Sequence, residues 1–314
     1  MTRKIGRFLI GAVALGCGTL ASSQQVPVVQ MPRPAEDVKI ETTELAPGIY
    51  MLTGRGGNIG LTVGVDGAAI IDDQFDDMAP KIRAAVSMLS ASPVKFVINT
   101  HLHGDHTGGN DAFGKAGAVI IAQENVRKRL GTPQTNPSTN QAIPARAREA
   151  LPVVTFEDAA TLHFNDDDLE FKHLPNAHTE TDIFVRFRQA NIVHMGDMFT
   201  GGFPFIDGNT GGTFDGLIKA HEAVLPTLDD QTKVIRGHGP LGNKAELQAY
   251  HDMLVVVRDR IAKLVKAGKS QDEVIAARPT KEFEEKYGGA SFNAAQWIGR
   301  AYVDQKAALE KKRR

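Results

Sequence analysis

A short run of histidines and one aspartate is the strongest chemical signal in the sequence. It reads His101-Leu102-His103-Gly104-Asp105-His106 and follows directly on a β-rich stretch. Imidazoles two residues apart on extended backbone can point to the same side. We expect Gly104 to allow a sharp turn, so that Asp105 and His106 face a second position nearby. This run therefore predicts a metal site rather than a histidine-rich surface loop.

Three further residues of the same kind follow predicted strand ends downstream. His178 and Asp197 come after apolar stretches, and His238 stands between two glycines. Each of them alone would be an ordinary loop residue, a turn or a cap. With the first run they make seven nitrogen and oxygen ligands, which are too many for one zinc ion and suit two.

The N-terminus predicts export. Basic residues precede an apolar run from Phe8 to Leu15, and small residues follow, as in a secretory signal peptide. We expect removal of residues 1–23 and a periplasmic, secreted protein. The only cysteine, Cys17, lies in this segment, so the mature chain has no cysteine ligand and no disulfide. A lipid anchor on Cys17 is the alternative to simple cleavage.

Composition indicates a globular protein with a small-molecule substrate. The 314 residues are 42% hydrophobic and 23% charged, with a formal net charge of -1. Such a balance gives no basic patch for nucleic acid. We expect no membrane contact of the mature form unless Cys17 is lipidated. The sequence carries no sign of the oligomeric state.

Strand and helix patterns alternate before the histidine run. Two apolar stretches flank Asp66-Gly67, which is a strong hairpin signal. Pro80 can begin a helix, and residues 94–98 form a β-rich stretch that leads into the run. The ends of strands are where α/β proteins place ligand sites. We therefore predict one α/β domain in which helices cover sheets.

The C-terminal part is predicted to be helical. An apolar stripe over residues 247–264 has helical spacing, and Gly268 is well placed to end that helix. Ser270 and Glu273 have the form of a capping box for the next helix. The polar stretch 131–143 is expected to be a loop without regular structure.

The motif His101-x-His103-x-Asp105-His106, followed by His178, Asp197 and His238, resembles the metallo-β-lactamase superfamily over about residues 40–270. The resemblance implies a four-layer αββα sandwich with a metal groove at one edge and extra C-terminal helices. We accordingly expect a hydrolase domain at 24–270 and a helical extension at 271–314 that packs on it.

The resemblance also assigns the ligands of two Zn²⁺ ions per chain. It implies that His101, His103 and His178 hold the first ion and that Asp105, His106 and His238 hold the second. Asp197 would bridge the two. The imidazole-rich first site favours zinc, although an aspartate bridge also tolerates iron or manganese.

The implied chemistry is hydrolysis by a metal-bridging hydroxide that attacks a carbonyl. Asp105 would orient the hydroxide and shuttle a proton. The export signal and the all-histidine first site favour β-lactam ring opening, a β-lactamase activity of the kind that gives antibiotic resistance. Asp197 and Gly237-His238-Gly239 are typical of glyoxalase II-like thioesterases and lactonases. A phosphodiesterase fits export poorly, and a non-catalytic metal-binding accessory protein is the alternative of another class.

Several neighbouring residues are weaker candidates. The stretch from Phe199 to Gly212 is expected to form a wall or lid, with Asn58 on another edge of the groove. The candidate substrate contacts are Phe203, Phe205, Asn209 and Asn58. The residues expected to orient metal ligands from behind are Asp72, Asp73 and His194.

Overall fold

The computed structural model describes residues 34–135, 140–289 and 293–312 of the chain. The predicted signal peptide at 1–23, with Cys17, lies outside the described residues. None of the helices in the described ranges combines the length and the apolarity that crossing a membrane requires. All seven candidate ligands lie within the described part.

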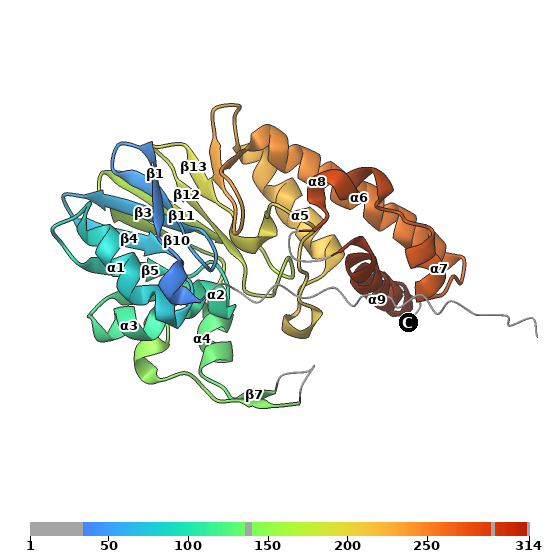
Figure 1. The fold of residues 1–314 in the computed structure, drawn as a ribbon, viewed down its shortest axis with the longest axis horizontal. Coiled ribbons are helices and arrows are strands. Elements are labelled where there is room, and N and C mark those ends of the chain that lie inside the picture. Colours follow the sequence, from blue (N-terminus) through green and yellow to red (C-terminus); the bar gives the residue numbers. More distant parts are fainter. Residues whose placement is uncertain (1–33, 136–139, 290–292, 313–314) are drawn as a thin grey trace, which may run out of the picture. The chain divides into compact units, whose positions relative to one another are not determined.

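Two β-sheets form the centre of the molecule (Figure 1). Within the described residues the first sheet runs β1-β2-β3-β4-β5-β6-β9, and its strands from β4 onward are parallel neighbours. The second sheet runs β10-β11-β12-β13-β14-β15, with β13 and β14 parallel. The strands are β1 (Glu41–Ala46), β2 (Ile49–Thr53), β3 (Ile59–Gly64), β4 (Gly67–Ile71), β5 (Val94–Ile98), β6 (Val119–Gln123), β9 (Val154–Phe156), β10 (Ala159–Phe164), β11 (Asp167–His173), β12 (Ile183–Phe187), β13 (Ile192–His194), β14 (Lys233–Ile235) and β15 (Gly242–Asn243).

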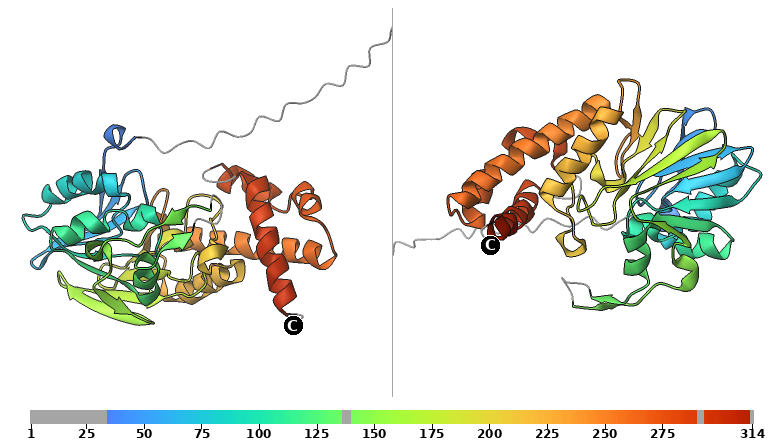
Figure 2. Two further views of the ribbon diagram at one scale, coloured as in Figure 1. Left: turned by 90° about the horizontal axis from the view of Figure 1, so that it is seen from below. Right: turned by 180° about the vertical axis from the view of Figure 1, so that it is seen from behind.

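Helices cover the outer face of each sheet (Figure 2). Over the first sheet lie α1 (Ala79–Ser87), α3 (Asn110–Lys115) and α4 (Glu124–Leu130), while α2 (Gly104–Thr107) lies at its edge. Over the second lie α5 (Phe214–Val224) and α6 (Lys244–Lys266), and against these pack α7 (Gln271–Ala276), α8 (Glu284–Tyr287) and α9 (Ala294–Lys312). The C-terminal helices thus share one apolar cluster with the second sheet.

Alternation of apolar residues along the strands produces the layers. Ile70 packs with the helices of the first sheet, whereas the next residue, Ile71, packs between the two sheets. In the second sheet Val234 faces the helices and Ile235 faces the first sheet. The order is helix, sheet, sheet, helix, which confirms the predicted αββα sandwich with extra C-terminal helices.

Most of the local predictions are confirmed. Asp66-Gly67 lies in the hairpin between β3 and β4, and the apolar stripe lies in α6. Gly268 ends that helix with a φ of 77°, and Ser270 and Glu273 form a complete capping box on α7. The expectation for 131–143 is wrong in part, because β7 (Gln134–Thr135) and β8 (Ala142–Ile143) pair there.

The strands that precede the candidate ligands end at one edge of the sandwich. β4 and β5 are parallel neighbours in the first sheet, as β13 and β14 are in the second, so each pair ends at the same side. The loop between β11 and β12 joins them there, because β12 runs antiparallel to β13. This edge therefore brings together residues that are far apart in the sequence.

Candidate metal centre

The seven candidate ligands converge at this edge in two groups. The ligand atoms of each group lie within 4.8 Å of one another. The first group is His101, His103, His178 and Asp197, and the second is Asp105, His106 and His238. The first group is rich in imidazole, while the second combines a carboxylate with two imidazoles. We call these groups the first and second subsites.

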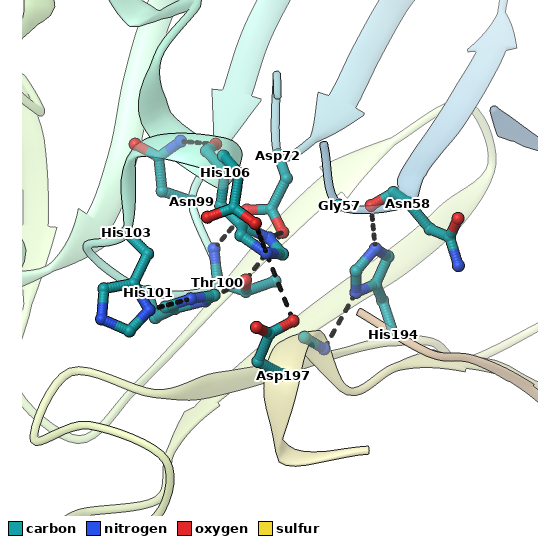
Figure 3. A network of polar contacts seen from close by, with 12 residues as sticks. Gly57, Asn58, Asp72, Asn99, Thr100, His101, His103, His106, His194 and Asp197 are labelled. Carbon is teal, nitrogen blue, oxygen red and sulfur yellow. Dashed lines mark hydrogen bonds and ion pairs between the residues drawn. The ribbon is translucent and has the colours of Figure 1, made fainter. Parts of the chain in front are cut away.

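Asp197 contacts residues of both subsites, and Figure 3 shows its contact with His106. Its Oδ1 is 3.2 Å from Nε2 of His106 and 3.4 Å from Nε2 of His238. Its other oxygen, Oδ2, is 3.7 Å from Nε2 of His178. One carboxylate therefore reaches both subsites, which is the placement that a bridging ligand needs.

Residues 101–106, which follow β5, contribute ligands to both subsites because α2 begins within them. His103 is the extended residue before α2, and Asp105 and His106 lie in that helix. Gly104 does not have a positive φ, and a Cβ built on it would meet only Nη2 of Arg146 at 3.8 Å. The expected role of Gly104 as a sharp-turn glycine is therefore wrong, since the start of α2 itself changes the direction of the chain.

Two other glycines are needed because the backbone passes very close to the ligands. A Cβ on Gly237 would lie 2.0 Å from Oδ1 of Asp197. A Cβ on Gly57 would lie 2.2 Å from Cε1 of His106. Neither position can carry a side chain without moving a ligand, so bare backbone forms part of the wall of the site.

The outer nitrogens of His103 and His178 are tied to oxygen acceptors. Nε2 of His103 donates to the Asp207 carboxylate at 3.1 Å, and Nδ1 of His178 donates to the Phe205 carbonyl. Carboxylate and carbonyl oxygens carry no proton, so in each of these hydrogen bonds the ring nitrogen is the donor. The remaining nitrogens face each other inside the site at 2.9 Å.

Asp72 fixes two more rings. It accepts from Nδ1 of His106 at 2.7 Å and from the Thr100 hydroxyl, also at 2.7 Å. Since the Thr100 hydroxyl has given its proton to Asp72, it accepts from Nδ1 of His101 at 3.0 Å. The Nε2 atoms of both histidines are therefore left to face the cluster. Figure 3 shows Asp72 behind these rings, as expected of a residue that orients ligands.

This donor set fits divalent metal ions. Burial lowers the pKa of His178 to about 4 and that of His101 well below its usual range, so their inward nitrogens are lone pairs at neutral pH. Both nitrogens face Nδ1 of His103, at 2.9 Å from His178 and 3.2 Å from His101, so three imidazole nitrogens point to one small space. Oδ1 of Asp197 is also directed at the rings of His106 and His238 in the second subsite. Imidazole and carboxylate donors of this kind are those that zinc prefers.

The second subsite differs because carboxylates surround it. Against the effect of burial, Asp197 and Asp105 raise the pKa of His238 to about 10, and the carboxylates of Asp197, Asp105 and Asp72 raise that of His106. Burial would raise the pKa of Asp105, but His106 and His238 lower it to about 2. Without metal this subsite therefore holds protons that a cation must displace.

One side of the site opens to solvent. The side chains of His101, His106 and His178 are fully buried, whereas that of Asp105 is 26% exposed and that of His238 is 39% exposed. A cavity of about 610 Å³ adjoins His238 and is lined by Gly54, Arg55 and Leu241, among others. A small molecule can therefore approach the metal-facing atoms from the Asp105–His238 side.

Several weaker candidates have other contacts. Phe203 is 2% exposed and stacks on Trp297, so it belongs to the core and not to a substrate surface. Asn58 is largely buried and its amide donates to the carbonyls of Arg236 and Gly239, but it also lines the cavity beside His238. Phe205 packs against the rings of His103 and His178. Asn209 is exposed and its backbone binds Asp207.

Asp73 and His194 support the backbone around the site rather than a ligand ring. The Asp73 side chain accepts from the Gly109 amide at 2.9 Å. His194 faces the carbonyl of Asn58 at 3.0 Å and accepts from the Gly196 amide (Figure 3). Of the three residues expected to orient ligands, Asp72 alone contacts a ligand ring through its side chain.

Thr100 and Asp207 are functional residues that the sequence analysis missed. Thr100 directly precedes the histidine run. Its hydroxyl donates to Asp72 and accepts from His101, and so links the two side chains. Asp207 lies in the stretch from Phe199 to Gly212, whose expected role was that of a wall or lid. The sequence does show a carboxylate shortly after the predicted ligand Asp197. Its partner, His103, is however 104 residues away, so the pairing could not be recognised.

Comparison with known proteins agrees with this geometry. The family described as the metallo-beta-lactamase superfamily matches residues 52–238, a range that contains all seven candidate ligands. No curated protein sequence matches the chain.

Solved structures show the same fold at low identity. A metallo-beta-lactamase from Pontibacter korlensis is 18% identical, with a TM-score of 0.56, 69% of this chain covered and 99% of that one. The DIM-1 metallo-beta-lactamase is 17% identical, with a TM-score of 0.55 and coverages of 69% and 98%. The sec-alkylsulfatase Pisa1 from Pseudomonas is 16% identical, with a TM-score of 0.65, 84% of this chain covered and 50% of that one. This chain thus spans half the length of the alkylsulfatase.

Replacing Asp72 by Asn tests the orientation of the rings. The amide cannot accept from both His106 and Thr100 as the carboxylate does, so we expect zinc affinity to fall by about 10- to 100-fold. Competition with a chromophoric chelator measures it. Asp73→Asn is the matched control and should bind zinc normally, because its side chain contacts the Gly109 amide. Equal losses in the two variants would contradict the role of Asp72.

Replacing Gly237 by Ala tests the close approach of the backbone to Asp197. The added methyl group must displace the carboxylate, so we expect loss of bound metal and destabilisation by about 1–3 kcal/mol. Metal analysis and thermal unfolding measure these effects. Gly104→Ala adds the same methyl group beside the ligands where there is room, and it should behave as the wild type. A Gly237→Ala protein with full metal content would refute the argument.

Metal binding should release protons from the second subsite. His238, with a pKa of about 10, is protonated at pH 7 in the metal-free protein and must lose a proton to bind a cation. Zinc affinity should therefore rise as pH rises towards that value. Titration calorimetry in two buffers of different ionisation enthalpy should show release of about one proton or more per chain. Identical heats in both buffers would contradict this assignment.

Proposed function

The chain belongs to the metallo-beta-lactamase superfamily of hydrolases, and on this premise we propose that it is a dinuclear zinc hydrolase that opens β-lactam rings. The observation that carries the proposal is the inward orientation of the seven ligands. Four imidazoles have their outer nitrogens occupied, and one carboxylate lies between the subsites. His101, His103 and His178 would hold one ion, Asp105, His106 and His238 the other, and Asp197 would bridge them.

Two zinc ions, when bound, supply a water of lowered pKa and a Lewis acid for a carbonyl oxygen. The protein itself positions the reactants. Asp105 is ionised, since its pKa is about 2, and it is partly exposed at the open side of the site. Its carboxylate can accept a hydrogen bond from an attacking water and pass the proton to the leaving nitrogen. Asp105 is thus the proposed proton shuttle.

The cavity beside His238 supports a small substrate rather than a polymer. Its volume of about 610 Å³ lies within the usual range for small-molecule sites. The Phe205 ring packs on His103, and the Arg300 guanidinium lies over it, 5.1 Å from its centroid. A compact amide with an apolar substituent would meet this ring beside the first subsite. The cavity beside His238 would hold the part of the substrate that extends beyond the second subsite.

A thioesterase or lactonase activity is the second candidate. The observation that favours it is the aspartate at position 197, together with Gly237-His238-Gly239, a combination typical of glyoxalase II-like members. A thioester or lactone carbonyl is more reactive than an unstrained amide, and the same donor set would serve both. The substrate class therefore has to be assigned by direct comparison.

We also propose that the enzyme acts after export to the periplasm. The basic and apolar start of the sequence supports this. β-Lactams reach their targets from outside the cytoplasm, so hydrolysis there would protect the cell.

Purified protein loaded with zinc should hydrolyse a chromogenic cephalosporin. A chelator should abolish the activity and added zinc should restore it. Asp105→Asn should lower kcat/KM by about 100-fold or more, because the shuttle and one ligand are lost together. Asp111→Asn, on the surface of α3 and paired with Lys115, is the matched control and should retain activity.

Parallel assays separate the substrate classes. The same preparation is tested on a thioester, a lactone and a secondary alkyl sulfate. Turnover of one of these without turnover of the cephalosporin would contradict the β-lactam assignment but keep the hydrolase. Absence of any turnover by the zinc-loaded protein would contradict the proposed chemistry as a whole.

A further inference from the structure

One short segment contacts the metal centre on one side and the C-terminal helices on the other. Residues 199–212, which we call the connecting segment, follow the bridging Asp197. On the metal side, the Phe205 carbonyl and the Asp207 carboxylate accept from His178 and His103. The Asp207 amide also donates to the His178 carbonyl at 2.9 Å. The segment therefore fixes two of the three imidazoles of the first subsite.

The neighbouring residues of the segment face α9. Indole Nε1 of Trp297 donates to the Pro204 carbonyl at 2.7 Å. The rings of Trp297 and Phe203 are stacked, with centroids 4.5 Å apart and planes 9° apart. The Phe203 amide donates to the carbonyl of Tyr287, the last residue of α8, at 2.8 Å. Positions 203 and 204 are thus attached to the C-terminal helices, while 205 and 207 hold the ligands.

The Trp297 side chain is held in place by the residues around it. It is 2% exposed and also packs against Phe214 of α5. It lies outside residues 52–238, the range that matches the family. A buried aromatic ring that stacks on one residue and donates to the next leaves the backbone between them little freedom. The position of the Phe205 carbonyl follows directly, since it is the next one along the chain.

We propose that Trp297 is a positioning residue for the first subsite. Through Phe203 and Pro204 it fixes the connecting segment, and the segment in turn orients His178 and His103. The C-terminal extension thereby supports the metal centre from behind. Of the two roles expected from the sequence, a wall or a lid, a segment held in this way fits the wall. This inference rests on the proposed metal centre, but it does not depend on which carbonyl substrate is hydrolysed.

The test is made in the full-length chain with Trp297→Phe. This change removes the hydrogen bond to Pro204 and keeps an aromatic ring against Phe203. Phe203→Leu is a second variant that removes the stacking and keeps the hydrogen bond. The readout is zinc affinity by chelator competition. His238→Ala serves as a common background, so that the one ion left reports on the first subsite. The Co²⁺ absorption spectrum reports on the geometry of the same ligands.

We expect each variant to lower zinc affinity of the first subsite by about tenfold, at the lower end of outer-shell effects because the influence is indirect. The Co²⁺ spectrum should shift with it. The matched control is Val274→Ala, a buried residue of α7 in the same apolar cluster. It should lower the melting temperature and leave zinc affinity unchanged, since a purely structural role of Trp297 would affect stability alone.

Two results would overturn the inference. One is wild-type zinc affinity in both Trp297→Phe and Phe203→Leu, and the other is an equal loss in Val274→Ala. Either would leave the proposed function standing, because the parent protein would still bind two zinc ions. A parent protein that binds fewer than two would instead contradict the proposed function, and this inference with it.

Discussion

An imidazole can present a lone pair to a metal only if its other nitrogen gives its proton to something fixed. In this protein each of four rings has such a partner, and all four partners are parts of the rigid frame. Asp72 serves His106 directly and His101 through Thr100, while the connecting segment serves His178 and His103. The outer hydrogen bonds thus decide where the inner nitrogens point. The geometry of the candidate metal centre is therefore set by the residues that surround the ligands.

The αββα architecture makes those partners available. Asp72 follows β4 and Thr100 follows β5, which are parallel neighbours, so a carboxylate and a hydroxyl from different strands meet at one edge. The second sheet brings Asp197 and His238 to the same edge from β13 and β14. The apolar cluster between the sheets, with Ile71, Ile98 and Ile235, holds the two halves in register. The geometry of the candidate metal centre therefore depends on ordinary strand packing one to three residues away.

The candidate ligands were easier to recognise in the sequence than the residues that support them. Five of the ten histidines and two aspartates stood out because metal ligands have a narrow choice of residue types and follow strand ends. Asp207 and Trp297 did not, because a supporting residue is recognised only by its partner. The bonds from His103 to Asp207 and from Trp297 to Pro204 join residues 104 and 93 positions apart. Phe203 was misjudged for the same reason, since an aromatic residue in a loop has no pattern that distinguishes core from surface. The helix α5 was not predicted either, although tertiary packing gives it a buried face, whereas α9 lies in the helical extension expected at 271–314.

A pair of cations sharing the Asp197 carboxylate would depend on elements from β4 to α9. Anomalous diffraction from crystals of the zinc-loaded protein at the zinc edge tests it most directly. Two peaks should appear on either side of Asp197, one among His101, His103 and His178 and the other among Asp105, His106 and His238. A single peak, or peaks that the Asp197 carboxylate does not touch, would contradict the dinuclear site.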